Sequence, residues 1–183
     1  AWLSKNSPFG ANALTVNPWM GLETLFPFIE VAKKNKSGIF ILLKTSNAGS
    51  KDIQDLLVNN RAVFLHLADL LQKDTSTNLG KFGYSDIGVV VGATQPKEAK
   101  LIRKILPKSL FLIPGFGAQG ASASEALSGL ILKNKIYEGG LINSSRSILF
   151  PKDSYDLNHS FKWKEKIVLA LKRTTDELKF RVD

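Results

Sequence analysis

Five short apolar runs rich in β-branched residues alternate with longer segments of helical periodicity, and this alternation constrains the fold more than any other feature. The predicted strands lie at 12–17, 38–45, 87–93, 110–114 and 139–143, and the predicted helices at 22–34, 50–71, 96–106, 122–133 and 159–180. Strands that are buried on both faces and joined by helices form a parallel sheet. We therefore expect an α/β fold, with residues 1–183 as a single domain.

Strand–helix units of this kind build the (β/α)₈ barrel, or TIM barrel. Five units are too few to close one, because eight units usually take about 250 residues. An open half-barrel would also leave two unpaired strand edges. We therefore expect the chain to be the C-terminal portion of a barrel, with an N-terminal barrel segment missing. The stretch 72–85 is the one long predicted loop, a lid or a mobile connection.

Two segments after the last two predicted strands indicate a phosphate site. Residues 113–120 have the sequence Ile-Pro-Gly-Phe-Gly-Ala-Gln-Gly, and residues 141–147 have the sequence Leu-Ile-Asn-Ser-Ser-Arg-Ser. In (β/α)₈ barrels the loops at these places commonly bind phosphate. Gln119 offers an amide donor, Arg146 a charged fork, and the backbone around Ser145 further N–H groups. The predicted ligand is a phosphate ester.

Composition excludes several classes of site and partner. The 183 residues include no cysteine, which excludes disulfides, iron–sulfur clusters and thiolate zinc sites. His66 and His159 are far apart and lack a carboxylate cluster, so no metal site is predicted. The net charge of +9 favours an anionic ligand. Its lysines are scattered along predicted helices, however, which indicates solvated faces and no nucleic-acid partner.

Neither a membrane nor a secretory route is expected. No run approaches the roughly 18 apolar residues of a membrane span, and the first residues lack the pattern of a signal peptide. The predicted location is therefore cytoplasmic.

Trp2, Trp19 and Trp163 fall in predicted strand or helix contexts, so we expect them in the core rather than stacked on nucleic-acid bases.

Five motifs, each at the carboxyl end of a predicted strand, resemble the longer bacterial branch of the orotidine 5′-monophosphate decarboxylase family. They are Thr-Val-Asn-Pro-Trp-Met-Gly at 15–21, Leu-Lys-Thr-Ser-Asn-Ala-Gly-Ser at 43–50, Val-Gly-Ala-Thr-Gln-Pro at 91–96, the segment 113–120, and Asn-Ser-Ser-Arg at 143–146. The resemblance covers essentially the whole chain. It implies that the five strands are the fourth to eighth of a TIM barrel.

The resemblance also implies an activity in pyrimidine (UMP) biosynthesis. The family is a lyase that converts orotidine 5′-monophosphate (OMP) to uridine 5′-monophosphate (UMP) and CO₂ without a metal or organic cofactor. It is dimeric, and an aspartate crosses the dimer interface, so a homodimer is implied here. The family's catalytic Asp-x-Lys-x-x-Asp run does not occur in residues 1–183. The resemblance therefore supplies substrate-binding residues for this chain and no catalytic ones.

Four of the implied positions surround the pyrimidine ring and its leaving group. Ser46 resembles the serine that hydrogen-bonds the ring, and Asn47 lies beside it. Pro114 and Phe116 resemble the apolar wall near the CO₂ pocket.

The other three implied positions bind the 5′-phosphate. Gln119 and Arg146 resemble the pair that holds the 5′-phosphate, with the backbone at Ser145 assisting. These are the residues that the loop chemistry indicates independently.

Other functions fit parts of the pattern. Lys44, inside an apolar strand run near the barrel mouth, could form a Schiff base with a sugar phosphate as in class I aldolases. It could also be a charged residue that simply reaches the barrel mouth or an acidic neighbour. A non-catalytic module that binds nucleotide phosphate is another alternative.

Residues 115–120 also match the dinucleotide-binding pattern Gly-x-Gly-x-x-Gly. They do not lie in the first strand–helix unit, however, and the next strand lacks the acidic residue that should end it. Asn17 either faces the substrate or ends its strand by bonding to the backbone.

Overall fold

A five-stranded parallel sheet lies at the centre of the computed structural model, which describes residues 2–77, 79–151 and 160–179. Its strands are β1 (Ala13–Val16), β2 (Gly38–Lys44), β5 (Ile87–Val91), β6 (Phe111–Ile113) and β9 (Gly140–Ile142). They pair in chain order, each parallel to the next. All five predicted strands and their parallel arrangement are confirmed.

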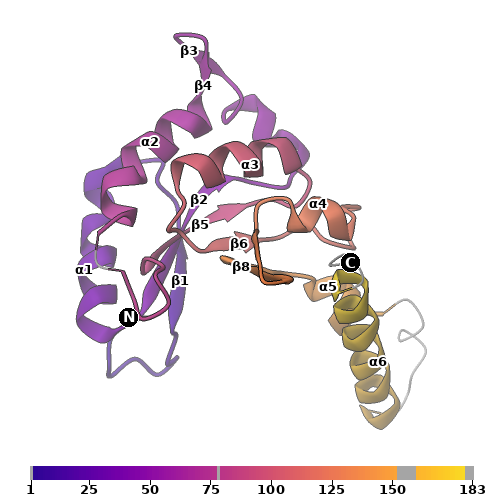
Figure 1. Cartoon of the computed structure of the whole chain (residues 1–183). Coiled ribbons are helices and arrows are strands. Elements are labelled where there is room, and N and C mark those ends of the chain that lie inside the picture. Colours follow the sequence, from indigo (N-terminus) through magenta and orange to yellow (C-terminus); the bar gives the residue numbers. More distant parts are fainter. Residues whose placement is uncertain (1, 78, 152–159, 180–183) are drawn as a thin grey trace.

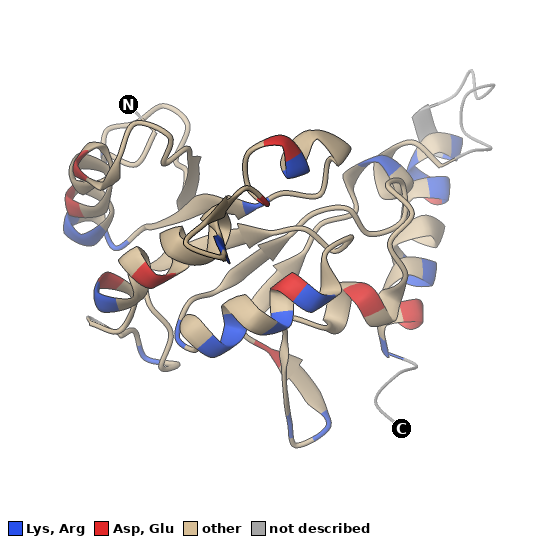
Figure 2. Ribbon diagram, turned by 90° about the horizontal axis from the view of Figure 1, so that it is seen from above, with Lys and Arg blue, Asp and Glu red and all other residues tan. Residues whose placement is uncertain are grey.

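Helices cover the outer side of this sheet (Figure 1). After the 3-10 helix η1 (Leu22–Thr24) they are α1 (Phe26–Asn35), α2 (Val63–Thr75), α3 (Pro96–Ile105) and α4 (Ala123–Leu127). The short α5 (Ser145–Leu149) follows β9, and the long α6 (Ser160–Lys179) packs on α5 and α4. Lys and Arg are spread over the outer helices and the loops rather than gathered in one stripe (Figure 2), as the sequence indicated.

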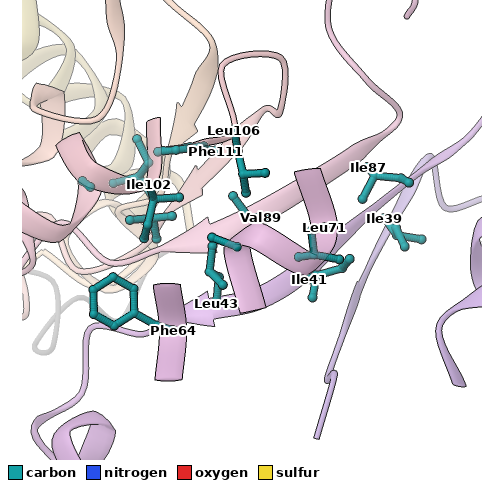
Figure 3. Close-up of a cluster of buried hydrophobic side chains, with 14 of the residues drawn as sticks. Ile39, Ile41, Leu43, Phe64, Leu71, Ile87, Val89, Ile102, Leu106 and Phe111 are labelled. Carbon is teal, nitrogen blue, oxygen red and sulfur yellow. The ribbon is translucent and has the colours of Figure 1, made fainter. Parts of the chain in front are cut away.

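The hydrophobic core lies between the sheet and these helices (Figure 3). Alternate residues of β2, such as Ile39 and Ile41, point into it and meet Phe64 and Leu71 of α2. The intervening β2 residues Phe40 and Leu42 face the other side and are only partly buried. The period of two along the strand therefore separates a helix-covered face from a barrel-facing one.

The predicted helix at 50–71 is wrong over its first half. The chain forms the 3-10 helix η2 (Ala48–Asp52) and then a hairpin of β3 (Leu57–Val58) and β4 (Arg61–Ala62) before α2 begins. Asn59 and Asn60 turn the hairpin with φ of 49° and 59°. Two successive left-handed residues make the tight hairpin turn that asparagine tolerates, which overrides the helical periodicity.

The predicted helix at 122–133 is also too long. After α4 the chain forms a second hairpin from β7 (Ile131–Lys133) and β8 (Ile136–Glu138). Asn134 and Lys135 turn it, again with positive φ. The predicted loop at 72–85 begins late, because α2 continues to Thr75.

Predicted helix starts are confirmed at two places. Pro96 occupies the first turn of α3. Ser122 caps α4: its hydroxyl accepts from the Glu125 N–H, and the Glu125 carboxylate accepts from the Ser122 N–H. This reciprocal capping box is what a serine three residues before a glutamate predicts.

The prediction of buried tryptophans is wrong. Trp19 is 72% exposed, and Trp2 and Trp163 are also exposed. Trp2 stacks on Phe9, and the Trp163 indole N–H donates to the Leu149 carbonyl. The rings therefore cover loops and helix ends at the surface. Among the described helices none is long and apolar enough to cross a membrane.

Candidate functional site

Four loops meet at the carboxyl ends of the sheet strands. They are 45–50 after β2, 92–96 after β5, 114–120 after β6 and 143–147 after β9. Backbone hydrogen bonds join neighbouring segments: the Gly92 N–H donates to the Lys44 carbonyl (2.7 Å), the Ala93 N–H to the Pro114 carbonyl (2.7 Å), and the Asn143 N–H to the Ile113 carbonyl (2.9 Å). Motifs that are up to 100 residues apart in the sequence thus form one surface, because parallel strands end at one edge.

Two glycines lie against Ser46, and one of them, Gly115, also adjoins Gln119. A Cβ on Gly92 would lie 2.7 Å from the Ser46 Cα. A Cβ on Gly115 would lie 3.0 Å from the Ser46 Cβ and 3.2 Å from the Gln119 Oε1. Gly115 also has φ of 106°, which disfavours any side chain there. The predicted ring-binding serine and the predicted phosphate-binding glutamine therefore converge on one glycine.

A third glycine brings the two predicted phosphate segments together. Gly117 has φ of 75°, and a Cβ there would lie 2.7 Å from the Ser147 Oγ and 3.3 Å from the Ser144 Oγ. The Ser144 hydroxyl also donates to the Phe116 carbonyl (3.2 Å). The loop that carries Gln119 therefore packs directly on the first turn of α5.

Arg146 and Ser145 lie in that first turn. Both are exposed, and no carboxylate among the described residues pairs with the Arg146 guanidinium. The first N–H groups of a helix have no acceptor inside the helix. The turn thus presents a charged fork and backbone donors beside the Gln119 loop, which is the donor set that a phosphate requires.

Asn47 belongs to a small side-chain network that sequence reasoning missed. The Thr45 N–H donates to Gln54 Oε1 (2.9 Å), and Gln54 Nε2 donates to Thr45 Oγ1 (2.9 Å). The Thr45 hydroxyl then donates to Asn47 Oδ1 (2.7 Å). The wrongly predicted helix concealed this pairing, because it placed Gln54 on a helix face instead of against the end of β2.

The predicted apolar wall has one buried and one half-buried member. Phe116 lies in the hydrophobic core, and Pro114 is half-buried at the end of β6. Their role beside a CO₂ pocket stays a prediction.

Lys44 is completely buried and has an acidic neighbour. Its Nζ lies 2.8 Å from Asp55 Oδ1 and 3.3 Å from Ser50 Oγ, and it sits 5.7 Å from the centre of the Phe64 ring. A Schiff-base lysine needs an accessible, unprotonated amine. This ion-paired amine, held against helix α2, does not favour the aldolase alternative.

Asn17 ends its strand by bonding to the backbone. Its Oδ1 accepts from the Trp19 N–H at 3.0 Å. Among the described residues no three His, Cys, Asp or Glu side chains gather to hold a metal ion. His66 instead contacts the Val58 carbonyl (2.9 Å), and His159 lies outside the described residues.

Comparison with known proteins places this geometry in a family. The model of the family described as "Orotidine 5'-phosphate decarboxylase / HUMPS family" matches residues 3–155. An orotidine 5′-phosphate decarboxylase from Rhodopirellula baltica is 36% identical over 94% of this chain and 57% of its own length. One from Caldicellulosiruptor bescii is 44% identical over 80% of this chain and 47% of its own length.

Solved structures agree with the fold. A putative orotidine 5′-phosphate decarboxylase from Streptomyces avermitilis matches 100% of this chain and 58% of its own, with a TM-score of 0.74 and 26% identity. The Leishmania donovani OMP decarboxylase matches 94% of this chain and 59% of its own, with a TM-score of 0.66 and 28% identity. These matches confirm the predicted partial TIM barrel. The chain spans about half the length of the curated relatives it matches.

Proposed function

The chain belongs to the orotidine 5′-phosphate decarboxylase / HUMPS family, and from that premise we propose that it forms the nucleotide-binding part of an enzyme that converts OMP to UMP and CO₂. The observation that carries the proposal is the contact at Gly117 between the loop that carries Gln119 and the first turn of α5. That contact places two exposed donor side chains, Gln119 and Arg146, on adjoining segments.

In this proposal the 5′-phosphate binds at the junction of the two segments. Arg146 supplies charge and a bidentate fork, Gln119 an amide N–H, and Ser145 a backbone N–H. An oxygen-rich dianion matches this donor set, since neither segment places a carboxylate there. The net charge of +9 assists its approach.

The pyrimidine ring then binds at the ends of β2 and β6. Ser46 and Asn47 offer hydrogen-bonding groups for the ring edge, and Pro114 and Phe116 supply the apolar side. Ser46 and Gln119 meet at Gly115, so a single nucleotide can reach both groups.

The chemical step breaks the bond between C6 of the ring and the carboxylate carbon. CO₂ leaves, the electron pair remains on C6, and a proton then adds there. A lysine and carboxylates placed for the transition state serve this step. The Asp-x-Lys-x-x-Asp run that supplies them in the family is not in the 183 residues. Phosphate contacts far from C6 contribute binding energy that orders the site around the reacting atoms.

Two assays test the proposal. Isothermal titration calorimetry should show that the chain binds UMP more tightly than uridine, because the phosphate contacts dominate. OMP turnover, followed by loss of absorbance, should appear only when the part of a relative that this chain does not match is added. Absence of UMP binding would overturn the proposal, and turnover by the chain alone would overturn the division of roles.

A non-catalytic nucleotide-binding module is the second candidate. The observation in its favour is that the exposed donors Gln119 and Arg146, on adjoining segments, can bind a phosphate without any reacting group beside them. UMP binding without turnover, even with the complementing part present, would favour it. The homodimer implied by the family resemblance belongs to the first proposal, and analytical ultracentrifugation of the complemented enzyme tests it.

A further inference from the structure

Lys44 is buried on the helix side of the sheet because the β2 strand is irregular at its end. Leu42 pairs with Val90 and Lys44 pairs with Val91, so Leu43 is an extra residue in the register. In a regular strand, Leu43 and Lys44 would face opposite sides. The bulge lets both side chains enter the layer under α2, where Lys44 meets Phe64.

The partners of Lys44 both come from the segment that follows β2. Asp55 Oδ1 lies 2.8 Å from Nζ, and Ser50 Oγ lies 3.3 Å from it. The Lys44 side chain is 0% exposed, whereas that of Asp55 is 35% exposed. An ammonium without water depends on these two groups, so the position of the segment is strongly coupled to that of the lysine. The pair joins the end of the strand to residue 55 and closes the loop 45–54 at its base.

Inside this closed loop, Ser46 and Asn47 are held from two sides. On the β5 side, Thr94 Oγ1 donates to the Ser46 carbonyl (3.1 Å), and Gly92 adjoins the Ser46 backbone. On the Lys44 side, the reciprocal hydrogen bonds of Thr45 and Gln54 lead on to Asn47. Loss of the ion pair would release the second side only.

We propose that the Lys44–Asp55 ion pair is a positioning device that sets affinity for the pyrimidine base without contacting the nucleotide. The inference rests on the proposed function, because it takes Ser46 and Asn47 as the base-binding residues. The phosphate residues Gln119 and Arg146 follow other strands, β6 and β9. The ion pair therefore acts on the base end of the nucleotide and leaves the phosphate end in place.

The test compares UMP with ribose 5-phosphate, which carries the phosphate and no base. Lys44→Met keeps the length of the side chain and removes its charge. We expect it to weaken UMP binding about tenfold and to leave ribose 5-phosphate binding unchanged. Lys44→Arg retains a donor for Asp55 and should restore most of the UMP affinity. Lys51→Met is the matched control, an exposed lysine in the same segment whose loss should change neither affinity.

The outcomes separate this inference from the proposed function. If the unmodified chain does not bind UMP, the proposed function fails. If it binds UMP no more tightly than ribose 5-phosphate, the inference alone fails. The inference also fails alone if Lys44→Met weakens the binding of both ligands equally, or weakens the binding of neither. If circular dichroism shows that Lys44→Met is unfolded, Asp55→Asn takes its place, because it removes the charge of the more exposed partner. The binding of UMP and of ribose 5-phosphate is then compared for that variant.

Discussion

Two arginines at opposite ends of the sheet differ in how far the protein itself satisfies their guanidinium groups. Arg103, on α3 near the amino ends of β6 and β9, is half-buried, and its guanidinium carbon lies 3.6 Å from the centre of the Phe111 ring. It donates four hydrogen bonds, to the backbone carbonyls of Leu106, Ser109, Gly129 and Gly139. Arg146, at the carboxyl ends, is exposed and has no carboxylate partner among the described residues.

The difference lies in where the donors point. Arg103 joins α3, the turn after α4 and the starts of two strands through hydrogen bonds to their backbone carbonyls. Burial lowers the pKa of Arg103 to about 10, an effect that the nearby Tyr84 opposes, so the side chain is still charged at neutral pH. An arginine satisfied by the protein stabilises the fold, whereas one left open at a glycine-rich edge is available to a ligand.

The largest expected effect is on stability, at Arg103. Arg103→Met would take the guanidinium donor from the buried carbonyls of Ser109 and Gly129, and should lower the free energy of unfolding by about 3–4 kcal/mol. Urea denaturation measures the change. Lys104→Met, on the exposed side of the same helix, should cost less than about 0.5 kcal/mol. If Arg103→Met lowered the free energy of unfolding as little as Lys104→Met does, Arg103 would not stabilise the fold and its contrast with Arg146 would disappear.

The next largest effect is on binding, at Arg146. Arg146→Ala should weaken UMP binding by about 2–3 kcal/mol, since a charge-assisted hydrogen-bonding group is lost, with little change in uridine binding or in unfolding. Titration calorimetry with both ligands measures this. Arg146→Lys should recover only part of the affinity, because a lysine cannot form the bidentate fork. An equal loss for UMP and uridine would count against a phosphate role.

A smaller effect should arise where the two phosphate segments touch. Gly117→Ala would combine a strained φ of 75° with a contact 2.7 Å from Ser147 Oγ, and should cost about 1–2 kcal/mol of stability. Gly120→Ala is the matched control, because its φ of 89° is strained while nothing lies within 4 Å. The difference between the two thermal unfolding curves isolates the contact. Equal costs would show that packing of the loop on α5 contributes nothing.

The smallest effect concerns the Glu125 carboxylate. It accepts hydrogen bonds from the N-cap residue of its own helix, much as Arg103 donates its hydrogen bonds to neighbouring carbonyls. Hydrogen bonds from the Ser122 backbone and hydroxyl lower the pKa of Glu125. Because the pKa of Glu125 is lower in the folded chain than the unfolded value of 4.5, its ionised carboxylate stabilises the fold above pH 4.5. This stabilisation is lost as the pH falls through the folded-state pKa. NMR titration should find the Glu125 pKa below 4.5 and closer to 4.5 in Ser122→Ala. An unchanged pKa in that variant would disprove the assigned cause.

Sequence reasoning succeeded where one local pattern has one structural outcome. Each apolar run became a strand, and α3 and α4 begin at or next to the first residues of the helices predicted at 96–106 and 122–133. It failed at residues 53–62 and 128–133, where apolar residues at helical spacing lead into hairpins or form part of them. The overlooked signals were the pairs Asn59-Asn60 and Asn134-Lys135, whose left-handed backbone ends any helix.

The candidate site was predictable to a similar degree. Glycines and donors after β6 and β9 indicated two segments that belong together, and the structure brings these segments into contact at Gly117. That they bind phosphate stays a prediction. The partner of Lys44 was predictable only as some acidic neighbour. Its identity as Asp55 depends on a bulge and on a loop that returns to the strand end.

The sequence by itself therefore determined the parallel α/β layout, the order of the strands and the residue types at their ends, because periodicity and turn chemistry are local. Only the tertiary structure decided which of those residues meet. It brought Ser46 to Gln119 across Gly115, and it turned Lys44 away from the barrel-facing side of the sheet. Such contacts depend on register and on close backbone approach, which are set by the packing of segments far apart in the chain.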